Sequence, residues 1–119
     1  MTSATLGVRM RDGKADLLQG TLDLLILKAL GNTPLHGWAI SKRIQQTSRD
    51  VLSVNQGSLY PALYRLEDRG WIVGSEESSP EGRRIKVYRL TLAGQQQMTE
   101  AVQSWRVFSL AVNHVLRAT

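Results

Sequence analysis

Residues 55–90 read NQGSLYPALYRLEDRGWIVGSEESSPEGRRIKVYRL, and this stretch decides the fold. Leucines recur at i, i+4 and i+7 from Leu59, a spacing that predicts one buried face of a helix. Gly70 ends that helix, and the apolar residues after it begin a strand. The turn-rich segment 78–82 then leads into the basic strand 83–90. A helix, a break and a basic hairpin in this order are typical of a winged helix-turn-helix.

Two helices are predicted upstream of this stretch. The segment 17–30 is apolar on more than one face, so we expect it to pack on the domain core and also on a partner subunit. The segment 33–37 is predicted to be a connecting loop, followed by a helix over 38–47. A polar joint over 48–54 then leads to the helix of the opening stretch. Two short helices joined by a turn are the arrangement that enters a major groove of DNA.

The positive charge of the chain is unevenly distributed along the sequence. The net charge is +5, and four of the fifteen basic residues fall within seven positions that contain no acidic residue: Arg83, Arg84, Lys86 and Arg89. The remaining eleven basic residues nearly balance the ten acidic ones. A basic strand attracts a phosphate backbone, although it also serves to protect a solvated sheet edge. Its position beside a helix-turn-helix favours nucleic acid.

Composition excludes several other classes of protein. The chain of 119 residues contains no cysteine, so it has neither a disulfide framework nor a thiolate metal site, and we expect a cytoplasmic protein. Its longest apolar run, residues 24–27, is too short to span a bilayer, and residues 1–16 are expected to form a flexible N-terminal arm. His36 and His114 each lie far from another histidine, so no metal site is predicted. No nucleophile with a paired base, catalytic residue or cofactor motif is found, which argues against an enzyme.

The segment 91–119 is predicted to be one long helix that joins two copies of the chain. Its apolar residues step by 4, 3, 4 and 3, the spacing of a helix that pairs with another helix. Trp105 is also a candidate for binding a planar aromatic ligand, with ordinary interface packing as the alternative. The expected dimer contacts are Leu18, Leu22, Ala101, Trp105, Phe108, Val112 and Val115.

Several linked motifs resemble those of the PadR-type transcriptional regulators. The segments LQGTLD at 18–23, HGWAI at 36–40, GSLYPALYRLE at 57–67 and YRLTLAG at 88–94 carry the resemblance, which runs over residues 17–116. It implies a homodimeric repressor that binds an inverted repeat of double-stranded DNA, in the short form with a single C-terminal helix. One departure is Trp38, where the family pattern usually has tyrosine.

Candidate DNA contacts follow from projecting the helix of the opening stretch with its leucines inward. The backbone N–H groups at the helix start favour a phosphate, and the side-chain amide of Asn55 or Gln56 could instead read adenine. Asn55 is equally well explained as an N-cap. Tyr60 is a weaker candidate than Tyr64, because half-buried packing explains it as well. Wing cations are expected on phosphates or in the minor groove, with Arg89 as a structural charge. The predicted DNA-binding residues are Asn55, Gln56, Gly57, Ser58, Tyr60, Tyr64, Arg65, Arg83, Arg84 and Lys86.

The sequence therefore predicts a mainly α, α+β fold. A winged helix-turn-helix with a two-stranded wing would span residues 17–90, between the arm at 1–16 and the dimerisation helix at 91–119. The leading function is sequence-specific regulation of transcription, with a planar aromatic molecule as a possible effector. The alternative is a winged-helix module that binds protein or RNA.

Overall fold

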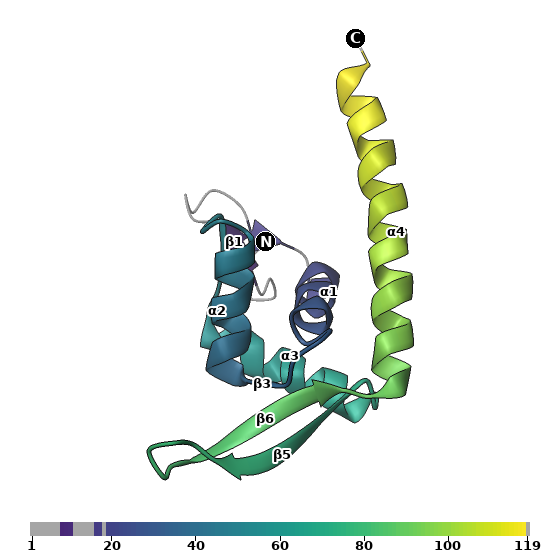
Figure 1. Ribbon diagram of the computed structural model, residues 1–119. Coiled ribbons are helices and arrows are strands. Elements are labelled where there is room, and N and C mark those ends of the chain that lie inside the picture. Colours follow the sequence, from purple (N-terminus) through teal and green to yellow (C-terminus); the bar gives the residue numbers. More distant parts are fainter. Residues whose placement is uncertain (1–7, 11–15, 18, 119) are drawn as a thin grey trace.

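Three helices pack around one apolar core in the computed structural model, which describes residues 8–10, 16–17 and 19–118 (Figure 1). They are α1 (Gln19–Ala29), α2 (Gly37–Thr47) and α3 (Gln56–Asp68). Each helix buries its leucine and isoleucine stripe, and a strand and a tyrosine complete the core. The side chains that are almost completely buried are Leu22, Ile26, Leu27, Ile40, Leu59, Leu63, Leu66 and Ile72.

Side-chain caps fix where the helices begin. The Asn55 Oδ1 accepts a hydrogen bond from the Ser58 N–H at 2.8 Å, and this cap starts α3 one residue later. The His36 Nδ1 accepts from the Ala39 N–H at 3.4 Å at the start of α2. At the other end of α3, Gly70 takes a φ of +78°, the left-handed conformation that glycine adopts without strain. The predicted boundaries of these helices are therefore confirmed within two residues.

The wing is an antiparallel hairpin of β5 (Ile72–Ser78) and β6 (Arg84–Leu90). A third strand, β3 (Leu35–His36), pairs with β6 and gives the sheet order β3-β6-β5. The prediction of a loop over 33–37 was wrong at these two residues, because two residues show no periodicity and pair only once β6 is beside them. Through β3, the start of α2 is attached directly to the base of the wing (Figure 1).

A second small sheet lies at the joint between α2 and α3. Its strands are β1 (Val8–Met10), β2 (Asp16–Leu17) and β4 (Leu52–Val54), in the order β2-β1-β4. We predicted a flexible arm over 1–16 and a polar joint over 48–54, whereas the structure forms strands within both segments. The physical reason is that β4 has a strand edge with unpaired backbone groups, and β1 pairs with that edge. Residues 1–7 and 11–15 lie outside the described residues.

The last helix, α4 (Leu92–Arg117), is 26 residues long and leaves the core after its first turns (Figure 1). Its first turn lies against the residue before β5, so closely that a Cβ at Gly94 would overlap the Trp71 carbonyl oxygen. Met98 packs on the core, whereas the residues beyond it are largely exposed. None of the described helices combines the length and the apolar character that a membrane span requires.

Candidate nucleic-acid interface

The outward face of α3 is exposed, as the projection from the sequence predicts. Its buried residues are Leu59, Ala62, Leu63 and Leu66. Tyr64 is 75% exposed, more than Tyr60 on the same helix, so a ligand can reach its ring. The exposed positions of α3 are Gln56, Gly57, Tyr60, Pro61, Tyr64 and Asp68.

Gly57 has no steric reason within its own chain to be glycine. A Cβ at this position would meet only the Asn55 Oδ1, at 3.4 Å, which is a van der Waals contact. Glycine inside a helix nevertheless costs about 1 kcal/mol relative to alanine. Pro61 stands one turn later and supplies no N–H to the Gly57 carbonyl. Glycine and proline thus make the exposed start of α3 less stable, and they leave its backbone open to close approach by another molecule.

Tyr60 has a structural role at the crossing of α2 and α3. A Cβ at Gly37 would lie 2.6 Å from the Tyr60 hydroxyl oxygen, so the ring fills the space that this glycine leaves. The ring still remains 44% exposed. The packing explanation for Tyr60 is therefore the stronger one, as the sequence indicated.

Arg65 is engaged inside the domain. Its guanidinium donates to the Asp23 carboxylate at 2.5 Å and so joins α3 to α1. This ion pair is partly buried, with the Arg65 side chain 25% exposed. Arg65 is thus less available to DNA than the sequence suggested.

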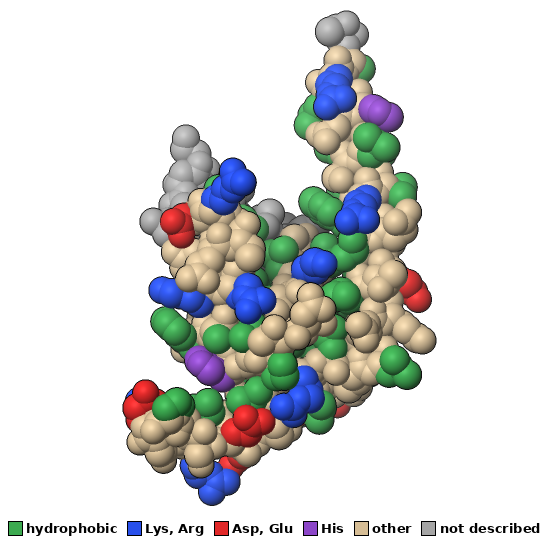
Figure 2. All heavy atoms as spheres, in the orientation of Figure 1, with side chains coloured by type: hydrophobic (Ala, Val, Ile, Leu, Met, Phe, Trp, Pro, Cys, Tyr) green, Lys and Arg blue, Asp and Glu red, His purple; other side chains and the backbone are tan. Residues whose placement is uncertain are grey.

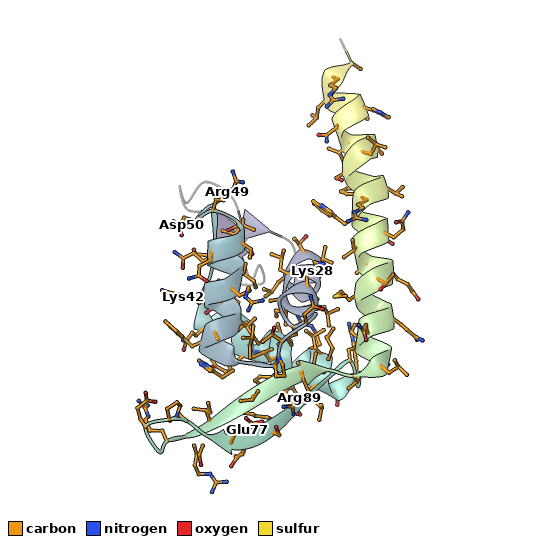
Figure 3. The ribbon with its side chains drawn as sticks, in the orientation of Figure 1. Lys28, Lys42, Arg49, Asp50, Glu77 and Arg89 are labelled. Carbon is orange, nitrogen blue, oxygen red and sulfur yellow. The ribbon has the colours of Figure 1, made fainter. Side chains whose placement is uncertain are left out.

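The wing is much less cationic than its basic strand alone indicates. Arg84 pairs with Glu76, Lys86 with Glu67 at 3.3 Å, and Arg89 with Glu77 at 3.3 Å. Figure 2 shows acidic and basic side chains close together along the hairpin, and Figure 3 labels Arg89 and Glu77. Our prediction of an unbalanced basic patch is therefore corrected, because β5 and α3 supply carboxylates to three of the four cations.

Arg83 differs from the other three wing cations. In the part of the chain that the structure describes, it makes no ion pair with a carboxylate. It stands at the tip, where the Ser79 N–H donates to its carbonyl at 2.7 Å and Gly82 takes a φ of +83°. The tip is thereby shaped by its backbone, and the Arg83 guanidinium remains available.

Glu67 connects the wing to α3 at two points. Its Oε1 accepts from the Lys86 Nζ at 3.3 Å, and its Oε2 accepts from the Gly74 N–H at 3.2 Å. Lys86 also lies over the Tyr88 ring, 5.4 Å from its centroid. The hydrogen bond to Glu67 raises the pKa of Lys86, while burial raises the pKa of the Tyr88 hydroxyl. Lys86 therefore stays positively charged, and the Tyr88 hydroxyl stays protonated, until the solution is strongly alkaline.

The predicted dimer contacts fall into two groups. Trp105, Phe108, Val112 and Val115 are exposed along α4, and Figure 2 shows apolar side chains over that helix. Ala101 is half-buried on the same helix. Leu22 is only 1% exposed because it belongs to the core, so its prediction as a dimer contact is corrected. Leu18 lies outside the described residues.

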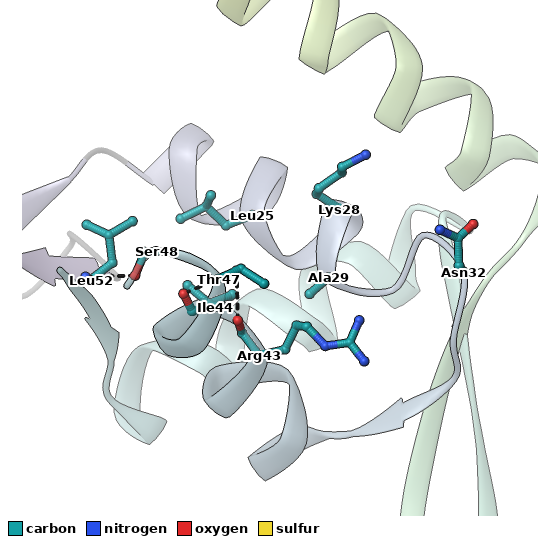
Figure 4. A pocket seen from close by; sticks show the side chains of 9 residues that line it. All are labelled: Leu25, Lys28, Ala29, Asn32, Arg43, Ile44, Thr47, Ser48 and Leu52. Atoms are coloured by element: carbon teal, nitrogen blue, oxygen red, sulfur yellow. Dashed lines mark hydrogen bonds between the residues drawn. The ribbon is translucent and has the colours of Figure 1, made fainter. Parts of the chain in front are cut away.

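A groove of about 480 Å³ lies between α1 and α2 (Figure 4). Its floor is apolar, with Leu25, Ala29 and Ile44, and its rim includes Lys28 and Arg43. Trp105 does not line this groove; its ring instead lies 6.1 Å from that of Phe108. Among the described residues, no group of three or more histidine, aspartate or glutamate side chains is arranged to hold a metal ion.

Two features of this surface were missed by the reasoning from sequence. One is Glu67, whose role depends on where the hairpin lies against α3. The other is the set of carboxylates on β5. In the register of the hairpin, Glu76 lies opposite Lys86 on the neighbouring strand. Counting residues outward from the predicted turn would therefore have placed the β5 carboxylates beside the cations of β6.

Comparisons with known proteins identify what this arrangement is similar to. The model of the "Transcriptional regulator PadR-like family" matches residues 26–100. A transcriptional regulator of Mycobacterium tuberculosis is 40% identical over 77 residues, which cover 65% of this chain and 68% of that protein. A solved PadR-like regulator from Bacillus cereus is 30% identical, with a TM-score of 0.72 over 85% of this chain and 96% of its own. One from Eggerthella lenta is 27% identical, with a TM-score of 0.71 over 85% and 86%.

Proposed function

This chain belongs to the PadR-like family of transcriptional regulators, whose members bind DNA and are not enzymes, and from that premise we propose that it is a homodimeric repressor. In this proposal the dimer binds an inverted-repeat operator in the cytoplasm, with one α3 helix in each of two successive major grooves.

The observation that carries the proposal is the outward face of α3. Gly57 lowers the stability of the helix although the chain leaves room for a Cβ there, and a close approach of the DNA backbone or base edges to this turn explains that glycine. Gln56 precedes it in the first turn, where N–H groups without a partner inside the helix favour a phosphate, whereas the Ser58 N–H already donates to the Asn55 side chain. Tyr64 would extend farther into the major groove of the DNA. Since Asn55 uses its side-chain oxygen as the cap, Gln56 is the better candidate for reading adenine.

On the wing, the proposal assigns the main phosphate contact to Arg83. Arg84 is a second contact, because its side chain is 81% exposed and a solvent-exposed ion pair costs little to exchange for a phosphate. Lys86 and Arg65 are instead assigned to holding the wing and α3 in place. The minor groove or the adjacent backbone is the expected target of the tip.

Dimerisation follows from the exposed apolar side of α4. α4 exposes Trp105, Phe108 and Val112 on one side. These side chains contribute hydrophobic free energy only if a second chain covers them. A two-fold dimer would place two α3 helices in symmetry-related positions, which is why an inverted repeat is expected. The Trp105 and Phe108 rings, which are tilted by 45° to each other, would also offer aromatic faces to a planar aromatic effector.

The experiment is a binding titration with labelled duplexes. One duplex carries the DNA upstream of the chain's own gene, and a second has the same length and a random sequence. We expect tighter binding to the upstream duplex, and weaker binding to both as salt rises. Binding of single-stranded RNA as tightly as of the upstream duplex would overturn the proposal in favour of an RNA-binding module.

A further inference from the structure

Trp38 is an exposed aromatic residue that the proposed contacts leave unused. It lies in the first turn of α2 and is 54% exposed. The Lys42 Nζ lies 5.1 Å from its ring centroid, and the His36 ring stacks beside it at 6.3 Å with an interplanar angle of 12°. The indole is therefore held in one orientation by a cation and an imidazole, which lowers the entropy that it would lose on binding a ligand.

Two hollows of the surface meet at this indole. One, of about 250 Å³, lies between α2 and the start of α3 and is lined by Trp38, Lys42, Asn55 and Gln56 among others. The other, of about 520 Å³, lies between the start of α2 and the wing tip and includes Trp38, His36, Pro80 and Arg83. Trp38 lines both hollows. It thus stands on a continuous path from the proposed recognition helix to the proposed wing contact.

The chemistry of this path matches one strand of a nucleic-acid backbone. Each hollow contains a cation, Lys42 in the first and Arg83 in the second, where the acidic Glu81 also lies, and an apolar ring separates the two cations. A sugar–phosphate chain alternates anionic phosphates with sugars whose C–H groups pack on an aromatic face. The indole N–H adds a donor for a phosphate oxygen. An acidic peptide would also satisfy the cations, but continuity with α3 and the wing tip favours DNA.

We propose that Trp38 is a DNA-backbone contact, on which a deoxyribose packs while Lys42 and Arg83 hold the phosphates on either side. This inference rests on the proposed function, because it needs α3 and the wing on the same duplex. A contact to the backbone does not read the sequence, so it adds affinity equally to every duplex.

A direct test follows Trp38 fluorescence in a chain that carries Trp71→Phe and Trp105→Phe, which leaves Trp38 as its single tryptophan. Acrylamide quenching is measured with and without the upstream duplex, while anisotropy of the labelled duplex reports the complex. We expect the duplex to lower the quenching constant several-fold. If the complex forms and quenching is unchanged, the Trp38 contact is wrong although the proposed function stands. If no complex forms with the native chain, the proposed function itself fails.

Affinity measurements on the otherwise native chain give a second test that does not depend on the double substitution. Trp38→Ala is expected to weaken binding to the upstream and random duplexes by the same factor, about tenfold, the scale of losing one aromatic anchor. Trp38→Phe should recover most of this loss, short of the part that the indole N–H supplies. Unaltered affinity, or a loss confined to the upstream duplex, would overturn the assignment.

Lys42→Gln supplies the electrostatic test. It should weaken both duplexes and reduce the slope of log affinity against log salt by about one. The matched control is Lys28→Gln, which removes the same charge from α1, on another part of the surface (Figure 3). A slope that changes equally in both variants would show that Lys42 acts only through the net charge, against the proposed contact.

Discussion

Two glycines of this chain are explained by opposite physical reasons. Gly94 is required by the fold, because a Cβ there would overlap the Trp71 backbone. A Cβ at Gly57 would make only an ordinary contact with the Asn55 Oδ1, at 3.4 Å, so the fold alone would accept alanine. Gly57 is in addition exposed on the outward face of α3, and the two observations together indicate a partner outside the chain. The sequence places Gly57 on the outer face of α3, but only the structure separates it from a glycine like Gly94.

Gly57→Ala is expected to separate stability from binding. Alanine is the better helix former, so the free energy of unfolding should stay the same or rise by up to about 1 kcal/mol. Affinity for the upstream duplex should fall, because the new methyl group occupies the space that DNA is proposed to use. Urea denaturation and duplex anisotropy measure the two effects. If the variant binds as well as the native chain, DNA does not come close to Gly57.

Gly94→Ala should destabilise the whole domain. The added Cβ would force α4 away from Trp71, and we expect a loss of about 3 kcal/mol in unfolding free energy. The matched control is Gly20→Ala, in the first turn of α1, where nothing lies within 4 Å and the change should be below about 1 kcal/mol. Equal urea midpoints for the two variants would contradict the tight contact between α4 and the Trp71 backbone.

At the scale of elements, the position of the wing relative to α3 is what the sequence could not supply. The charges of β6 are visible in the sequence, but their partners depend on the hairpin register and on Glu67 from α3. Glu67 accepts from both strands of the hairpin, from Gly74 in β5 and from Lys86 in β6. We therefore assign this carboxylate the role of holding the wing at its angle to the recognition helix.

Glu67→Gln tests this role through the sign of its effect. Removing a negative charge near DNA should strengthen binding, if electrostatics alone decides. If Glu67 positions the wing, the loss of its ion pair should instead weaken binding to the upstream duplex, by several-fold. Glu81→Gln at the exposed wing tip is the control, and there we expect slightly tighter binding. Stronger binding by both variants would leave Glu67 without a positioning role.

The predictable elements are those with a local signal. The leucine spacing of α3 and the turn at Gly70 each depend on neighbours in the sequence, and both were predicted correctly. The Asn55 cap is the one of two open explanations that the structure shows. By contrast, β3 is two residues long and exists because β6 offers a partner, and β1 likewise requires the edge of β4. Short strands of this kind carry no periodicity of their own, so only the assembled fold specifies them.

At the scale of the whole molecule, α4 extends beyond the domain that it belongs to (Figure 1). Its heptad-like stripe was predicted from the sequence, whereas the assignment of Leu22 to a dimer contact failed because α1 is surrounded by core. The exposed stripe makes Phe108→Asp informative, since Phe108 is 60% exposed and its loss removes little core packing.

Phe108→Asp is expected to give a folded monomer, because a buried charge on both sides of a two-fold interface is costly. Sedimentation velocity measures the oligomeric state, and circular dichroism checks that the helices remain. Gln103→Asp, on the far side of the same helix, should leave the native chain's oligomeric state unchanged. A dimer that survives Phe108→Asp would mean that another surface joins the two copies.

The central claim is that two copies of α3 read one inverted repeat, and footprinting combined with stoichiometry on the upstream duplex tests it most directly. We predict two chains per duplex and two protected half-sites related by a dyad, with their centres about one helical turn, or 10 base pairs, apart. One chain per duplex, or protection no different from that on random DNA, would contradict the account.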